Sequence, residues 1–67
     1  ILEALKARYE AEIAEADATA NIYLENSVGI GEHPQHIDEV NKQIEKIAAA
    51  REKLEVLEQF EPERAVL

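Results

Sequence analysis

The sequence predicts an all-α fold, an antiparallel hairpin of two helices that self-associates into a four-helix bundle. Both glycines and one of the two prolines, Gly29, Gly31 and Pro34, fall within six consecutive residues near the middle of the chain. Long runs of helix-forming residues lie on either side of this turn. A hairpin of 67 residues buries little apolar surface, and the chain has no cysteine to cross-link it. Association between copies is therefore the expected source of further stability.

The same pattern divides the chain into consecutive parts of one helical-hairpin domain, residues 1–67. We expect a helix over about residues 2–27, a turn over 28–33, a second helix over about 34–60 and a tail over 61–67. Each part has its own sequence signal.

The first predicted helix has two apolar faces. One stripe of larger apolar residues follows a 3-4-4-3-4-4 spacing: Leu2, Leu5, Tyr9, Ile13, Ala16, Ala20 and Leu24. A second stripe lies opposite it, at about 100° per residue, and is the predicted self-association surface: Ala4, Ala7, Ala11, Ala14, Ala18 and Ile22. Small residues allow helix backbones to approach closely, although the helix propensity of alanine is a simpler explanation of the same stripe.

The predicted turn carries helix stop and start signals. Gly29 suits a left-handed residue just past the helix end, because it has no Cβ. Ile30 would then fold back onto Leu24. Pro34 suits the first position of the next helix, where its missing N–H is no loss.

The second predicted helix places its apolar residues close to a heptad pattern: Ile37, Val40, Ile44, Ile47, Ala50, Leu54 and Leu57. Folding the chain at 29–33 aligns positions whose numbers sum to about 60, with the pairs Ile13 and Ile47, Ala16 and Ile44, and Ala20 and Val40. Large residues therefore meet small ones. Pro62 is expected to end the helix, and the tail that follows is expected either to fray or to dock near Val56 and Phe60.

The net charge of −8 is placed unevenly along the sequence. Residues 9–41 contain no lysine or arginine and hold all the excess charge, in an acidic head near the turn: Glu10, Glu12, Glu15, Asp17, Glu25, Glu32, Asp38 and Glu39. The last three are expected near the positive end of the second helix dipole. This sign disfavours direct nucleic-acid binding.

Chemical sites are scarce in the sequence. His33 and His36, beside Glu32 and Asp38, are the only cluster that resembles a metal site, and they lack the ligand spacing of a bundle metal centre. A helix cap and a residue at the edge of the core explain both histidines. Ser27 and Thr19 lie in no arrangement of nucleophile and base. We therefore expect no enzyme activity, no cofactor and no bound metal.

Two further patterns concern aromatic packing and the membrane. Tyr9 and Tyr23 are expected to pack in the core or an interface, with their hydroxyls at its edge. No run approaches the ~18 apolar residues of a membrane-spanning helix, and no secretion signal opens the chain. We expect a soluble protein without a membrane partner.

Three strings resemble those of a known protein group: Tyr9-Glu-Ala-Glu-Ile-Ala-Glu-Ala16, Val28-Gly-Ile-Gly-Glu-His-Pro34, and Ile-Glu-Lys-Ile-Ala at residues 44–48. The chain is similar, over roughly residues 2–60, to small uncharacterised proteins of contractile-tailed cyanobacterial phages. The resemblance implies a viral accessory protein in the host cytoplasm or the virion. It transfers no catalytic residue.

The sequence thus favours a non-enzymatic structural or interaction module that forms homo-oligomers. An unidentified protein is a further possible partner. The alternative is an acidic inhibitor or nucleic-acid mimic, in which the acidic head occupies a basic groove on another protein.

Overall fold

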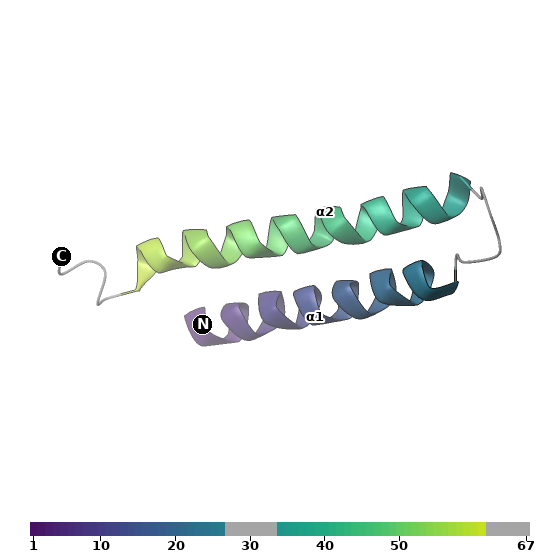
Figure 1. The fold of residues 1–67 in the computed structure, drawn as a ribbon. Coiled ribbons are helices and arrows are strands. Elements are labelled where there is room, and N and C mark those ends of the chain that lie inside the picture. The colour runs from purple at the N-terminus through teal and green to yellow at the C-terminus, as the bar shows by residue number, and fades with distance from the viewer. Residues whose placement is uncertain (27–33, 62–67) are drawn as a thin grey trace.

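The chain forms two long antiparallel helices that lie side by side (Figure 1). The computed structural model describes residues 1–26 and 34–61. Helix α1 spans Leu2–Asn26, helix α2 spans Pro34–Leu57, and a short 3₁₀ helix, η1, spans Glu58–Phe60. These described residues contain no strand. The all-helical hairpin predicted from the sequence is therefore confirmed.

Helix α1 is closed at both ends by local hydrogen bonds. At its start the Leu5 amide donates to the Ile1 carbonyl at 3.0 Å, and at its end the Asn26 side-chain amide donates to the Ile22 carbonyl at 2.9 Å. The turn that follows, with Gly29, Ile30 and Gly31, lies outside the described residues. The predicted left-handed Gly29 therefore stays a prediction.

Helix α2 begins at its predicted proline and ends at Leu57, and the 3₁₀ helix η1 continues the helical segment to Phe60, shortly before Pro62 in the sequence. Pro34 is its first residue. At the other end Glu61 has φ −82° and ψ 130°, the extended conformation that a following proline imposes. One expectation for this helix is wrong, because its first turn holds no acid. Asp38 and Glu39 start the second turn, where the helix dipole has little effect.

The register of the hairpin is also confirmed. The Tyr23 and His36 rings meet edge to face, with centroids 5.6 Å apart and planes at 66°. At the other end the Lys53 Nζ lies 5.4 Å from the centre of the Tyr9 ring. The numbers of these pairs sum to 59 and 62, against the predicted value of about 60.

The contact face of α1 follows the predicted stripe for most of its length. Ala16 and Ala20 are buried, and the four preceding members of the stripe are half-buried. The last position differs, since Leu24 is 55% exposed and the half-buried Tyr23 takes its place. Tyr23 reaches the interface because its ring packs against His36.

The contact face of α2 is rotated from the one predicted. Ile37 and Ile44, both expected in the core, are 71% and 56% exposed. The half-buried His36 and the buried Gln43 face α1 in place of these two isoleucines. The contacting residues alternate strictly between steps of four and three: His36, Val40, Gln43, Ile47, Ala50, Leu54 and Leu57. In a helix pair with this period, only two columns of side chains on each helix lie in the contact between the helices, which we call the seam. The column of Ile37 and Ile44 lies to one side of the seam.

The rotation still matches large residues with small ones. By the observed register, the long Gln43 side chain lies at the level of Ala16 and Ala20. Ala50 is 1% exposed and lies at the level of the larger Tyr9 and Ile13. The predicted pairing of Ala16 with Ile44 is therefore wrong in its partner, while its principle of small against large is retained.

This seam leaves the hairpin without a substantial core. Among the described residues the buried apolar side chains are three alanines, Ala16, Ala20 and Ala50, and no large side chain is fully buried. The chain measures 54 × 15 × 15 Å, with a radius of gyration of 16.0 Å. A compact domain of this length would have about 11 Å.

Candidate functional site

The described residues gather no group that could hold a metal. Within residues 1–26 and 34–61, no three histidine, cysteine, aspartate or glutamate side chains lie close enough to share an ion. His36 is half-buried against Tyr23 at the edge of the helix interface, as the packing interpretation predicted. His33 lies outside the described ranges.

The residues considered for nucleophilic chemistry also have structural roles or no described position. The Thr19 hydroxyl donates to the Glu15 carbonyl one turn earlier, at 2.9 Å, a common local bond of threonine in helices. Ser27 lies outside the described residues. Nothing in the described part of the chain brings a base to Thr19.

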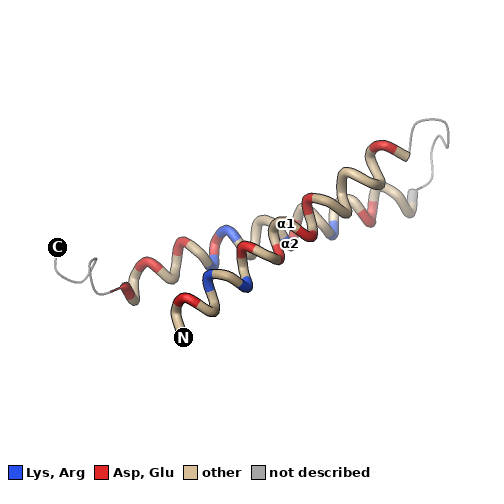
Figure 2. The backbone as a smooth tube through the Cα atoms, turned by 90° about the horizontal axis from the view of Figure 1, so that it is seen from below, with Lys and Arg blue, Asp and Glu red and all other residues tan. Residues whose placement is uncertain are grey.

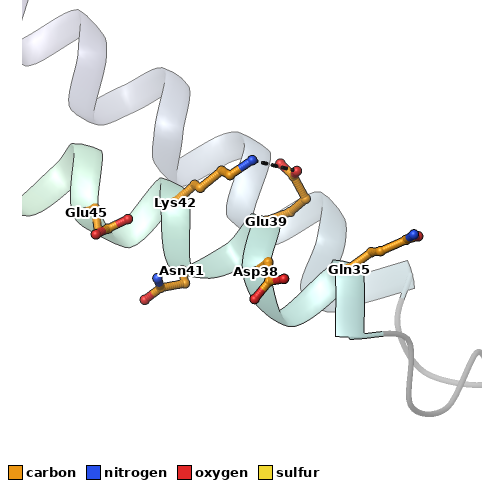
Figure 3. A pocket seen from close by; sticks show the side chains of 6 residues that line it. All are labelled: Gln35, Asp38, Glu39, Asn41, Lys42 and Glu45. Carbon is orange, nitrogen blue, oxygen red and sulfur yellow. Dashed lines mark hydrogen bonds and ion pairs between the residues drawn. The ribbon is translucent and has the colours of Figure 1, made fainter.

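A shallow depression of about 340 Å³ lies on the outer surface of α2 (Figure 3). All its lining residues come from that one helix: Gln35, Asp38, Glu39, Asn41, Lys42 and Glu45. The Lys42 Nζ lies 3.3 Å from Glu39 Oε1, and Figure 3 shows the other side chains pointing apart rather than toward a common centre. Such an arrangement does not enclose a ligand.

A second depression, of about 430 Å³, lies near the end of α2 and is more apolar. It is lined by Tyr9, Ala49, Glu52, Lys53, Val56, Leu57 and Phe60. Lys53 lies over the Tyr9 ring within the range of a cation–π contact, so its ammonium covers part of this groove. Val56 and Phe60 remain 42% and 62% exposed.

The predicted self-association stripe lies on the side of α1 that faces away from α2. Its six members are all exposed: Ala4, Ala7, Ala11, Ala14, Ala18 and Ile22. Ile22, the largest, is 57% exposed. The hairpin therefore leaves this face uncovered, and its role in self-association stays a prediction.

The acidic head contains no lysine or arginine in the sequence, but in the folded hairpin basic residues of α2 lie close to it. Glu10 to Asp17 lie, by the observed register, beside the stretch of α2 that contains Lys46, with Lys42 and Arg51 at its borders. Figure 2 shows basic residues on α2 alongside the acids of α1. Glu39 and Lys42 form the one ion pair within the described ranges. Of the described head, Glu25 and Asp38 lie on the turn side of Lys42 and form no ion pair within the described residues.

Sequence reasoning missed the exposed column of Ile37 and Ile44, because three apolar columns on α2 were all assigned to the core. The available signal was the strict seven-residue recurrence of His36, Gln43, Ala50 and Leu57, which competes with that column for the seam. Two polar residues in the recurrence concealed it.

Comparisons of the chain with protein-family models, curated proteins and solved structures give no match. None of the described helices has both the length and the apolar composition needed to cross a membrane.

Proposed function

We propose that this chain is a non-enzymatic structural or interaction module that works as a homo-oligomer, with the outer stripe of α1 as one of its assembly surfaces. The resemblance to phage proteins supports a viral context for this module, as a small accessory protein of the host cytoplasm or the virion. A second copy is its first partner, and the assembled surface is available to a further protein.

The observation that carries this proposal is the missing core. A compact monomer of 7.5 kDa exposes about 4,200 Å², whereas this chain exposes 5462 Å². The difference exceeds the roughly 800 Å² that each partner buries in a standard protein interface. Burial against another copy would bring the chain to the exposure of an ordinary folded protein of its mass.

Light scattering behind a sizing column tests the proposal. We expect the protein at tens of micromolar to elute with a mass well above the 7.5 kDa of one chain. Ala11→Glu or Ala14→Glu should lower that mass, because a carboxylate on the outer stripe would have to lose its water in the interface. Glu12→Gln, between them in sequence but off the stripe, is the matched control and should leave the mass unchanged. A monomeric wild-type protein contradicts the proposal.

The alternative, an acidic mimic, has one supporting observation: the α1 acids form no ion pair within the described residues. Their density argues against it. Five acids between residues 10 and 25 span about 22 Å of helix, roughly one charge per 4.5 Å, whereas duplex DNA carries one per about 1.7 Å.

A salt titration distinguishes this alternative. If a basic partner is bound through the acidic head, its affinity should fall steeply between low and physiological salt. Amide replacement of Glu10, Asp17, Glu25 and Glu32 should slow association more than the same change at Glu52, Glu55, Glu58 and Glu61. If the affinity for the partner changes neither with salt nor with these substitutions, the mimicry alternative is ruled out.

A further inference from the structure

One side of the hairpin is apolar across both helices, and we call it the isoleucine flank: Ile13, Leu24, Ile37, Val40, Ile44 and Ile47. On α2, Ile37 and Ile44 are seven residues apart and so lie in one column, about 10 Å long. Both are more than half exposed. Val40 and Ile47 lie between this column and the seam, and are half-buried.

Helix α1 contributes to the same side. At about 100° per residue, Leu24 lies roughly 70° around α1 from the direction of α2, and Ile37 and Ile44 lie roughly 100° around α2 from the direction of α1. Because the two helices run in opposite directions, both rotations turn toward the same side of the hairpin. Leu24 is 55% exposed there, and Ile13 is half-buried at its edge.

The opposite side of the hairpin has the contrary character. By the same geometry it presents seven charged residues and a threonine, with the exposed Val56 and Phe60 beside Lys53 at its far end: Arg8, Glu12, Glu15, Thr19, Glu39, Lys42, Lys46 and Lys53. Over the levels of Ile37 to Ile47 the two sides of the hairpin therefore differ in character, one mainly apolar and the other mainly charged. This is the pattern of half a four-helix bundle, in which each hairpin turns one side of both its helices inward.

We propose that the isoleucine flank is the surface through which two copies of this chain pair into a four-helix bundle. The inference rests on the proposed self-association and assigns it a surface. Pairing through the outer stripe of α1 alone would place four helices in a row, because that stripe points directly away from α2, and would leave Ile37 and Ile44 in water. Pairing through the flank encloses them, and leaves the outer stripe free to join one bundle to another.

A second copy fits this surface better than an unrelated protein in both area and charge. The surplus exposed area of about 1,200 Å² is more than the roughly 800 Å² that one partner gives up in a standard interface, so it is enough for pairing with a second copy. The charged residues beside the flank also nearly balance, with Lys6 and Arg51 against Glu10, Asp17 and Glu55, although the chain as a whole carries −8. Two copies can therefore meet here without bringing two strongly negative surfaces together.

The first test is the double variant Ile37→Ser and Ile44→Ser, measured by light scattering over a dilution series. We expect the concentration of half-assembly to rise by at least about tenfold, because four exposed isoleucines per pair of chains lose their burial. Val56→Ser, an exposed aliphatic residue of the same helix away from both surfaces, is the control and should assemble like wild type. Wild-type assembly by the double variant overturns the flank as the interface.

A second measurement does not depend on the double variant staying folded. The chain has no cysteine, so Ile44→Cys and Val56→Cys each introduce a single thiol. Under mild oxidation or with a short bismaleimide, Ile44→Cys should yield covalent dimers and Val56→Cys should not. An oligomeric protein whose Ile44→Cys variant forms no such dimer contradicts the flank and leaves self-association standing. A monomeric wild-type protein contradicts both.

Discussion

Ala50→Glu is expected to abolish the helical fold. Ala50 is 1% exposed, the most buried apolar residue of the seam, and lies at the level of Tyr9 and Ile13. A glutamate there would place an uncompensated charge between the helices, at a cost of about 3–5 kcal/mol. A single core in so small a chain supplies no more than about 3–5 kcal/mol in total. The substitution should therefore remove most or all of the stability.

Circular dichroism of Ala50→Glu beside Ala49→Glu provides the measurement. Ala49 is the preceding residue of the same helix and is exposed, so the control has the same composition and net charge. We expect the Ala49 variant to remain helical with a melt close to wild type, since surface changes usually cost within about 0.5 kcal/mol. A helical Ala50→Glu with a wild-type melt would show that the two helices do not meet along this seam.

Gln43→Leu is expected to raise the melting temperature. Gln43 is the one buried polar residue among those described, at 7% exposure. Its amide makes no hydrogen bond within the described parts of the chain. An apolar side chain of similar volume places additional apolar surface in the contact between the helices, which is worth about 1 kcal/mol, or roughly 4–8 °C in a domain of this size.

Gln35→Leu makes the same chemical change at an exposed position of the same helix and serves as the control. It should shift the melt little. A Gln43→Leu protein that melts below wild type would indicate that the amide contributes to the seam. A polar residue can also fix the register of a helix pair, and a stabilised variant with mixed oligomer sizes would assign that role to Gln43.

The fold was largely predictable because its signals are local. The glycines and Pro34 mark the turn, Pro62 marks the end of the helical segment formed by α2 and η1, and the spacing of the α1 stripe indicates its contact face. The choice among three apolar columns on α2 was not predictable in this way. It depends on how the helices rotate to pack Gln43 over Ala16 and Ala20, and this is a property of the pair rather than of either helix.

The candidate surfaces also divide into one that the sequence predicts and others that depend on how the two helices pack. Exposure of the alanine stripe follows from its position opposite the contact face, and helix periodicity alone could place it. The isoleucine flank needed the structure, since Ile37 and Ile44 have the composition of core residues and only the rotation of α2 exposes them. The charge of the acidic head is likewise less isolated than the sequence suggests, because folding brings Lys46 to the level and the side of Glu12 and Glu15.

The central claim is that the hairpin is held together by its own copies, and a dilution series from tens of micromolar to tens of nanomolar tests it most directly. Helix content by circular dichroism and mass by sedimentation are measured on the same samples. We expect the two to fall together, and the melting temperature to drop on dilution, because each tenfold dilution of a dimer removes about 1.4 kcal/mol. A monomer that stays fully helical, with a melt independent of concentration, would contradict the account.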